Sequence, residues 1–407
     1  MTIILGKLKL KTLLLGLLTP LAAMGQSVEI TVSNPTKAQR MEVVEVNASA
    51  LFQKLGRPFG TPLVVKNAYG QQQTWQLTAD SLLLIEAAVY PEKRVSYTVT
   101  AGVPHPMRRY VDGQLYAWRV DDFTWENDKM AYRAYGPALQ RTGEKAYGFD
   151  VWLKSVPHLV VADRYAFVHQ TNARADKLRR LGWKAEADSI ALEASLHLDH
   201  GNGMDCYSVG PSLGCGTPAL MVGDSIVMPY CYSTYRVIDN GPLRFTAEFV
   251  YPPVSIDGQA DVVEHRLVSL DKGSYFNRLT VWYEHLKHPM KFCAGLVIHT
   301  EDPSTAVLGK HYIQYADPTD SPEKHGIQIY VAALFPYGKF TTKRLNAAQK
   351  AGNIAGHLLG ISTLYKDKQT YYMGAGWAGS GVRNQAMWQQ EIDTFLHNVA
   401  NPLQIEF

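Results

Sequence analysis

The segment from His197 to Gly216 concentrates side chains that can transfer protons or bind cations. Two histidines, two aspartates and one tyrosine fall within eleven residues, 197–207, and glycines recur along the segment. Each glycine inside a helix or strand costs about 0.5–1 kcal/mol relative to alanine, so we predict a loop. Loops on a rigid scaffold often carry binding and catalytic groups. The structural alternative is a tight connection whose histidines and aspartates cap neighbouring turns.

Three roles for these side chains follow from their chemistry. His197 or His200 could act as a general base or acid, with Tyr207 as its counterpart. A divalent cation is the second option, although the spacing matches no established zinc motif. Its ligands would be His197, Asp199, His200 and Asp205. Capping and packing are the third role. We predict acid–base chemistry, with no metal ligand and no required cofactor.

A second group of polar side chains precedes this loop. Four acids occur within the eight residues 121–128, and a predicted strand with Arg133 and Tyr135 follows. Side chains two residues apart on a strand point the same way, so the guanidinium and the phenol share a face. Together they could hold a carboxylate and move a proton. Alternatively, Arg133 bridges to an acid across the sheet.

Two further strands carry candidate binding residues. Asp150, Trp152 and Lys154 alternate onto one strand face, as in a sugar platform with polar ends. The alternative is an edge strand with solvated charges. His299 ends an apolar strand that begins at Gly295, and both a structural and a functional role remain open for it.

The start of the chain predicts a targeting segment over residues 1–25. Lys7, Lys9 and Lys11 form a basic region, and an apolar stretch from Leu13 to Ala23 is too short to span a membrane. We expect cleavage before Gln26 and a periplasmic or extracellular location. No cysteine follows that site, so we expect no lipoprotein anchor.

Charge and composition exclude some classes of partner. The formal charge of +3 falls to about zero without the three lysines of the targeting segment, so we expect no nucleic-acid binding. No later apolar run is long enough to span a bilayer. The 23 tyrosines and 8 tryptophans suit contacts with sugar rings, although they also suit sandwich cores.

The four cysteines lie at positions 206, 215, 231 and 293. An oxidising compartment would permit a disulfide between Cys206 and Cys215 that closes the loop. Buried free thiols are equally compatible with the sequence. The spacing contains no Cys-x-x-Cys pair and indicates no zinc site.

The remaining chain reads mostly as short strands separated by turn residues, which predicts an antiparallel β-sandwich. Two prolines at Pro104 and Pro106 interrupt the pattern. We predict one domain over residues 26–407, with a possible N-terminal sheet region over 26–102. The expected strands are Val28–Val32, Met41–Val46, Thr61–Val65, Gln73–Leu77, Leu82–Val89, Val95–Ala101, Met130–Tyr135, Leu159–Val161, Ile226–Met228, Tyr230–Val237, Leu243–Tyr251, Asp261–Leu270, Asn277–Tyr283, Lys291–His299, Gly326–Leu334 and Gln369–Gly374.

Two helices are expected to position the candidate residues. One covers Ala173–Leu196, is interrupted at Gly182, and leads directly into His197. The other follows Gly381, where apolar residues recur at helical spacing and indicate one packed face. These residues are Trp388, Ile392, Phe395 and Val399.

Several motifs together resemble an uncharacterised secreted family from the polysaccharide-utilisation loci of Gram-negative glycan degraders. The resemblance covers nearly the whole chain after the targeting segment, and its motifs are specific in combination. They lie at 125–128, 132–139, 148–154, 200–210, 214–216 and 374–378. Leu198 departs from the aromatic residue expected before Asp199.

The resemblance implies a galactose-mutarotase-like β-supersandwich, also suggested by the segment Glu264–Ser274. It further implies association with enzymes that process pectin and uronates. It supplies no established activity.

The leading functional hypothesis is a lyase that cleaves uronic-acid-containing oligosaccharides by β-elimination. This reaction needs a base, an acid for the leaving oxygen and neutralisation of the uronate carboxylate. His200 is the expected base, and Tyr207 or Tyr135 the acid. Arg133 and Asn127 are expected to neutralise the carboxylate.

Three alternatives remain open. A glycoside hydrolase would use two carboxyl groups among Glu126, Asp150 and Asp205. An epimerase or mutarotase is suggested by the fold resemblance alone. A non-catalytic carbohydrate-binding protein would use Trp152, Trp377 and tyrosines as a stacking surface.

The sequence therefore predicts an oligosaccharide or polysaccharide as the partner. It leaves open the glycan, the reaction, endo or exo action, metal dependence and the oligomeric state. The expected catalytic residues are His200, Tyr207, Asp205, Tyr135 and Arg133. The expected substrate-binding residues are Asn127, Glu126, Asp150, Trp152, Lys154, His197, His299 and Trp377.

Overall fold

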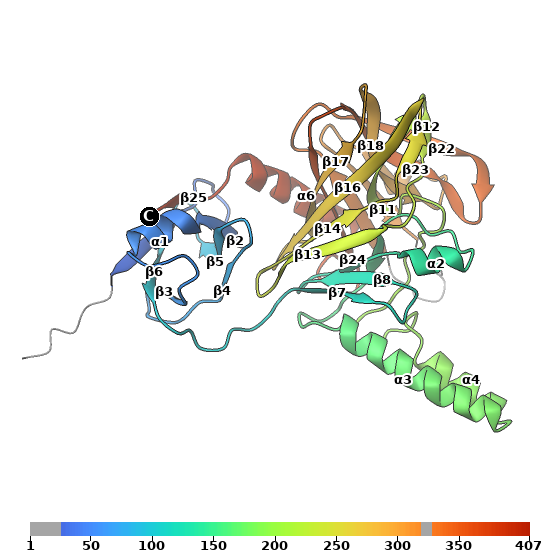
Figure 1. The fold of residues 1–407 in the computed structure, drawn as a ribbon, viewed down its shortest axis with the longest axis horizontal. Helices are drawn as coiled ribbons and strands as arrows, with labels where there is room; N and C mark the ends of the chain where they lie inside the picture. Colours follow the sequence, from blue (N-terminus) through green and yellow to red (C-terminus); the bar gives the residue numbers. More distant parts are fainter. Residues whose placement is uncertain (1–25, 319–327) are drawn as a thin grey trace, which may run out of the picture.

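A computed structural model describes residues 26–318 and 328–407. The predicted targeting segment over residues 1–25 lies outside the described residues, as does the start of the strand expected over Gly326–Leu334. The described chain is mostly β-structure, and its named strands pair antiparallel in five sheets. A small N-terminal sandwich lies beside a larger one (Figure 1). The predicted mostly-β, antiparallel sandwich architecture is confirmed.

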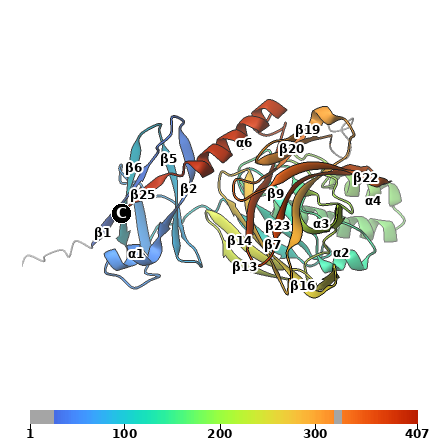
Figure 2. The same ribbon diagram turned by 90° about the horizontal axis from the view of Figure 1, so that it is seen from above.

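The N-terminal sandwich has its own hydrophobic core. Strand residues alternate between core and solvent, as period-two burial requires; in β1, for example, Ile30 and Val32 are fully buried. The last strand of the chain, β25, completes one of the two sheets by pairing with β1 (Figure 2). One sheet holds β25 (Gln404–Glu406), β1 (Ser27–Ser33), β6 (Arg94–Ala101) and β3 (Leu63–Asn67), and the other holds β2 (Arg40–Asn47), β5 (Leu82–Val89) and β4 (Trp75–Leu77). Helix α1 (Ala48–Lys54) follows β2.

The larger sandwich consists of a nine-stranded and a five-stranded sheet that share one core. The nine-stranded sheet holds β13 (Thr234–Asn240), β14 (Arg244–Val250), β15 (Val254–Ile256), β16 (Gln259–Asp271), β17 (Phe276–Glu284), β19 (Ala306–Leu308), β20 (Tyr312–Asp317), β21 (Ile329–Leu334) and β24 (Gln369–Trp377). The five-stranded sheet holds β11 (Cys215–Val222), β12 (Ser225–Val227), β18 (Met290–Ile298), β22 (Thr341–Ala351) and β23 (Ile354–Leu364).

A four-stranded sheet positions the candidate residues that precede the loop. Its strands are β7 (Asp112–Tyr116), β8 (Asp122–Glu126), β9 (Ala131–Ala134) and β10 (Asp150–Trp152). Trp125 and Tyr132 point into the core of the larger sandwich. Trp152 on the opposite face packs against Tyr165 of helix α3. Because neighbouring strand residues alternate in direction, Arg133 lies on the helix-covered face.

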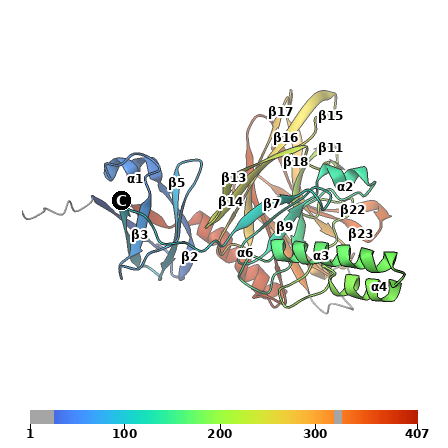
Figure 3. The same ribbon diagram turned by 60° about the horizontal axis from the view of Figure 1, so that its bottom comes forward.

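The helical hairpin on that face begins earlier than the sequence pattern indicates. Helix α3 covers Val161–Arg180, and α4 covers Lys184–Glu193 (Figure 3). The break at Gly182 is confirmed, because this residue has φ +87° between the helices. The strand expected at Leu159–Val161 is wrong. The Glu126 carboxylate accepts hydrogen bonds from the amides of Val160 and Val161 and caps the helix start there.

The final helix is confirmed as α6 (Gln385–Ala400). Asn384 caps it by accepting the amide of Met387 at 2.9 Å, and Trp388 and Ile392 are fully buried. Only two helices are expected from the sequence, whereas the described residues form five α-helices. The short helices α1 and α2 (Pro137–Arg141) carry too little periodicity to be recognised.

Two further features concern the whole described chain. Its four cysteines are buried and form no disulfide, so the option of a bridge between Cys206 and Cys215 is not realised in this structure. No helix of the described part is both long and apolar enough to cross a membrane.

Candidate functional site

The predicted loop is confirmed and crosses the edge strand of the four-stranded sheet. Backbone bonds fix it there, including Leu153 N to Met204 O at 2.9 Å and Asp205 N to Leu196 O at 2.8 Å. Gly203 has φ +103°, and a Cβ there would lie 1.9 Å from the carbonyl oxygen of Leu153. The close approach of loop and strand therefore requires glycine. It brings Asp205 beside the strands that carry Arg133 and Asp150.

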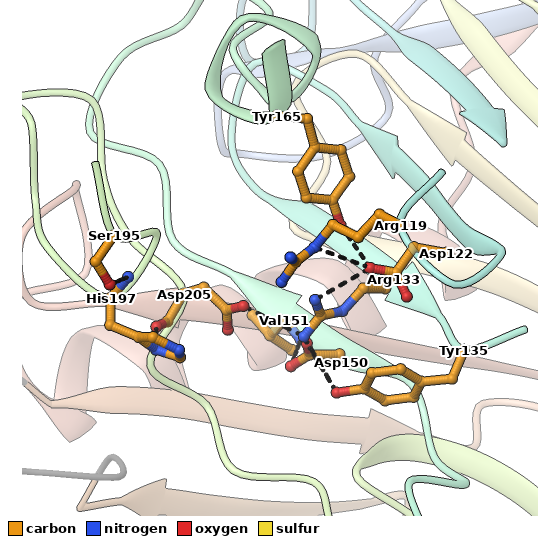
Figure 4. Close-up of polar contacts among 10 residues, drawn as sticks. All are labelled: Arg119, Asp122, Arg133, Tyr135, Asp150, Val151, Tyr165, Ser195, His197 and Asp205. Atoms are coloured by element: carbon orange, nitrogen blue, oxygen red, sulfur yellow. Dashed lines mark hydrogen bonds and ion pairs between the residues drawn. The ribbon is translucent and has the colours of Figure 1, made fainter. Parts of the chain in front are cut away.

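Arg133 is the centre of a buried polar cluster, which we name the Arg133 cluster (Figure 4). Its Nη2 donates to Asp150 Oδ2, to Asp205 Oδ2 at 3.2 Å and to Tyr135 Oη at 3.2 Å. Its Nη1 donates to Asp122 Oδ2 at 3.4 Å. Arg133 and Asp150 are register partners on β9 and β10, so the strand pairing itself brings them together. The predicted shared face of Arg133 and Tyr135 is confirmed by their contact.

The cluster contains more acid than one guanidinium can neutralise. Arg119 adds a second cation at 3.4 Å from Asp122 Oδ2. Burial raises the pKa of Asp150 to about 7; Arg133 opposes this shift, and the nearby Asp205 charge adds to it. Burial also raises the pKa of the Tyr135 phenol well above its usual value. Near neutral pH the cluster thus contains one carboxyl group close to its midpoint of protonation.

A second pair of proton-transfer groups includes Tyr207, two residues after Asp205 in the loop. The His299 Nδ1 atom lies 2.7 Å from Asp317 Oδ2, and the rings of His299 and Tyr207 meet edge-on with centroids 6.3 Å apart. Burial raises the pKa of Tyr207 well above its usual value, and the nearby Cys215, Asp317 and Asp150 add to the shift. The Tyr207 phenol is therefore protonated at neutral pH. The carboxyl groups of Asp150 and Asp317 both contribute to the shift of its pKa.

Two polar atoms of this pair lack partners. His299 Nε2 and Tyr207 Oη are buried and make no hydrogen bond with any described residue. Leaving such an atom buried without a partner costs about 1–3 kcal/mol, so native structures usually retain the arrangement for a reason. A bound ligand that reaches both atoms would provide one.

His357 lies near this pair but is already occupied. Its Nε2 accepts the backbone amide of Leu213 at 3.2 Å. Burial and the proximity of His299 lower its pKa to about 4. The imidazole of His357 is therefore neutral at physiological pH and serves as a hydrogen-bond acceptor for the loop backbone.

Several expected binding residues are occupied by structural contacts. Lys154 Nζ bonds Glu126 Oε2 and the Asn127 carbonyl, both at 2.5 Å. The Asn127 amide donates to the carbonyls of Asp271 and Ser274, which uses both of its hydrogens. These contacts join the four-stranded sheet to the turn after β16.

The two expected aromatic platforms are covered. The Trp152 ring lies beneath the guanidinium groups of Arg133 and Arg164, at 5.3 and 5.6 Å from its centroid. Trp377 is buried and donates its indole N–H to the Lys154 carbonyl at 2.7 Å. Neither face is open for a sugar ring to stack on.

The structure separates His200 from the tyrosine of the loop. His200 is exposed, with Nε2 3.2 Å from the Ser195 carbonyl and its ring edge-on to Phe167. His197 Nδ1 lies 2.6 Å from the Asp205 carbonyl. Within the described residues, His200 has no contact with Tyr207 or with the Arg133 cluster.

The alternative of a cation site finds no matching geometry. Asp199 Oδ1 accepts the amides of Gly201 and Gly203 at 2.8 and 2.9 Å, which is the capping role. Over residues 26–318 and 328–407, no group of three or more His, Cys, Asp or Glu side chains is placed to hold a metal ion. That no cofactor is required stays a prediction.

Two glycine patterns that elsewhere mark a serine nucleophile or a phosphate-binding loop also occur in the chain. Residues 210–214 match Gly-x-Ser-x-Gly, and 374–379 match Gly-x-Gly-x-x-Gly. Ser212 is fully buried, its Oγ donates to the Val209 carbonyl at 2.5 Å, and a strand rather than a helix follows. Gly374 and Gly376 lie within the antiparallel strand β24. The structure forms neither a nucleophile elbow nor a phosphate loop at these positions.

Sequence reasoning missed four residues of this region. Asp122, Tyr165, Asp317 and His357 carry no motif, and only Asp122 lies in a segment singled out for its acids. Tyr165 donates to Asp122 Oδ2 at 2.8 Å and comes from a helix whose start was not expected. Asp317 ends β20, in a stretch not assigned to any element.

Comparison with known proteins gives a relative and several distant structures. The chain is 25% identical over 400 residues to "Uncharacterized protein P7" of Formosa agariphila, covering 92% of each chain. An alpha-mannosidase structure from Enterococcus faecalis aligns with 94% of this chain at 9% identity and a TM-score of 0.45. A glycosyl hydrolase family 38 structure from the same organism has 9% identity and a TM-score of 0.46. The chain spans 46% and 47% of those two structures, less than half of each.

The strongest of these comparisons concerns the family. The family described as "Domain of unknown function (DUF4861)" matches residues 32–405, which include most of both sandwiches, the Arg133 cluster and the Tyr207–His299 pair. The chain therefore belongs to this family of domains of unknown function.

Proposed function

We propose that the protein is a carbohydrate-active enzyme that cleaves uronic-acid-containing, pectin-like oligosaccharides by β-elimination. One observation carries the proposal: Tyr207 Oη and His299 Nε2 are buried without a partner among the described residues, and their rings meet edge-on with centroids 6.3 Å apart. They are an acid and a base of the kind that proton transfer at a sugar carbon requires.

The tautomer of His299 assigns its role. When Nδ1–H donates to Asp317, the neutral ring has its lone pair on Nε2. Nε2 takes the proton from the carbon beside the uronate carboxylate, and the C–H electron pair becomes a carbon–carbon double bond. The bond to the leaving oxygen breaks, its electron pair departs with the oxygen, and Tyr207 supplies the proton. The imidazolium then returns a proton to the phenolate, directly or through water.

The Arg133 cluster would bind the uronate carboxylate. Arg133 Nε is a buried donor with no described partner, and the partly exposed Tyr135 is the most accessible phenol of the cluster. With Asp150 protonated, Arg119 and Arg133 balance Asp122 and Asp205 in charge. Deprotonation of Asp150 adds a negative charge that opposes an anionic sugar.

The carboxyl contacts favour elimination over hydrolysis. A glycosidase needs two carboxyl groups that flank the bond. Asp150 is fully buried, with Oδ1 accepting the Val151 amide at 2.7 Å and Oδ2 occupied by Arg133 and Tyr135. Glu126 is committed to Lys154 and the start of α3.

The test is product analysis on pectic and other uronate oligosaccharides. Elimination gives an unsaturated product that absorbs ultraviolet light, and we expect Tyr207→Phe to abolish it. A saturated product would instead indicate a hydrolase, and an isomerised product an epimerase. Glycan binding without any turnover would indicate a binding protein. Each of these three results would contradict the proposal.

A further inference from the structure

A cavity that is lined by neither Tyr207 nor His299 lies between the two sandwiches. It has a volume of about 650 Å³ and is bounded by β2, the β16–β17 turn, β24 and α6. Figures 1 and 2 show α6 running between the two sandwiches. Ligand sites typically have volumes of roughly 300–1,000 Å³ and often occur between domains. No residue of the Arg133 cluster lines this cavity.

Two tyrosines form an aromatic surface in the cavity. Tyr337 is 47% exposed, and its hydroxyl lies 3.4 Å from that of Tyr372, with ring centroids 6.3 Å apart. Phe395 of α6 packs edge-on against Tyr372 at 4.8 Å. Tyr372 is thereby fixed, while Tyr337 presents ring and hydroxyl to the cavity. Apolar rings with polar ends suit the faces and hydroxyls of sugars.

Most charged groups around the cavity are already paired. Arg244 bonds Asp271 at 2.6 and 2.7 Å and Glu45 at 2.6 Å. The Lys272 ammonium likewise pairs with Glu86. These two cations face three carboxylates, so the five groups together carry a formal charge of about −1.

Two charged side chains of this wall, Arg278 and Glu391, make no ion pair with any described residue. Arg278 is exposed to solvent. It is the register partner of Tyr372 on the neighbouring strand, so the two side chains share a face of the sheet. Its charge lowers the pKa of Tyr372, against the larger effect of burial. An unpaired guanidinium beside an aromatic surface suits a carboxylate attached to a sugar ring.

We propose that this cavity is a non-catalytic binding subsite for acidic oligosaccharides. A pyranose ring stacks on Tyr337 and Tyr372, and its carboxylate pairs with Arg278. The class of sugar rests on the proposed function, whereas the location rests on the cavity itself. The N-terminal sandwich, through β2, then contributes to holding the glycan.

The experiment is calorimetric titration with tetragalacturonate. The full chain carries Tyr207→Phe and His299→Ala, so that no turnover disturbs the measurement. Adding Tyr337→Ala or Arg278→Ala is expected to weaken binding at the subsite by at least about tenfold. Loss of affinity in the Arg278 variant should exceed that in the Tyr337 variant at low salt and diminish at high salt.

Matched controls are Tyr69→Ala and Arg174→Ala, two exposed side chains outside the cavity. Both should leave the affinity within about twofold, and circular dichroism should show all variants folded. Unchanged affinity in both cavity variants, or no binding of tetragalacturonate at all, would overturn the subsite. The two proposals fail in different experiments. If the proposed function is wrong, the protein without substitutions gives no unsaturated product, even when tetragalacturonate binds at the subsite.

Discussion

At the scale of single residues, the protonation of Asp150 is expected to make the activity depend on pH. Its pKa is raised to about 7 by burial, so the carboxyl group loses its proton near neutral pH. We predict that kcat/KM on a uronate substrate decreases as the pH rises above about 7, because the new negative charge opposes the substrate carboxylate. Asp150→Asn should not show this decrease. Superimposable pH profiles of the two proteins would contradict the prediction.

The raised pKa of the Asp150 carboxyl group also predicts how stability depends on pH. Its pKa is higher in the folded state than the usual value of about 3.9 in an unfolded chain. Between these two pH values, Asp150 keeps its proton in the folded state but loses it in the unfolded state. The stabilisation that this bound proton gives the folded state is lost as the pH rises. The free energy of unfolding of Asp150→Asn minus that of the unmodified protein should therefore increase from pH 5 to pH 8. Denaturant unfolding at both pH values measures it, and a constant difference would refute the assignment.

The sequence singled out some residues of the candidate site and misjudged the surroundings of others. Arg133 and Tyr135 share a face because strand alternation is local and can be read from spacing. Tyr207 and His299 come from distant parts of the sequence, and only the sheet pairing of β18 and the course of the loop bring them together. Local composition therefore drew attention to His200, which the fold leaves exposed.

At the scale of elements, the loop after α4 depends on one glycine. We predict that Gly203→Ala displaces the loop from β10, because its Cβ would lie 1.9 Å from the Leu153 carbonyl oxygen. The variant should lose both stability and activity. Gly201→Ala is the matched control: it also has positive φ, +84°, but nothing lies within 4 Å of its Cβ. Its cost should be only about 1 kcal/mol. Equal losses of stability in denaturant unfolding would contradict the role of the close contact.

The buried pair of Glu126 and Lys154 connects β8 with the residues that follow β10. Glu126→Gln should cost about 3–5 kcal/mol in unfolding free energy, because it leaves the Lys154 ammonium buried without a counter-charge. Adding Lys154→Met should recover part of that loss. A double-mutant cycle with additive effects would show that the pair does not interact as the structure indicates.

At the scale of the whole molecule, the mostly-β antiparallel sandwich could be predicted because short alternating strands dominate the chain. The helical hairpin could not be placed correctly, because the start of α3 depends on Glu126, which is distant in the sequence. A possible N-terminal sheet region could be predicted over residues 26–102, but the pairing of β1 with β25 at the far end of the chain could not. The division of the chain into domains stays a prediction.

The proposed mechanism uses only side chains of the protein. We therefore predict that removal of divalent cations with a chelator leaves the rate of product formation within about twofold. The rate is measured from the ultraviolet absorbance of the product before and after chelation. A large loss that added cations restore would show that a metal ion takes part.

The most direct test of the central claim compares two histidines in one assay. The measurement is the rate of unsaturated-product formation by His299→Ala and by His200→Ala on a uronate oligosaccharide. General acid–base groups contribute about 10²- to 10⁴-fold, so His299→Ala should lose that much in kcat while His200→Ala stays close to the unmodified protein. Loss of activity in His200→Ala with activity retained in His299→Ala would contradict the assignment of Tyr207 and His299 as the proton-transfer pair.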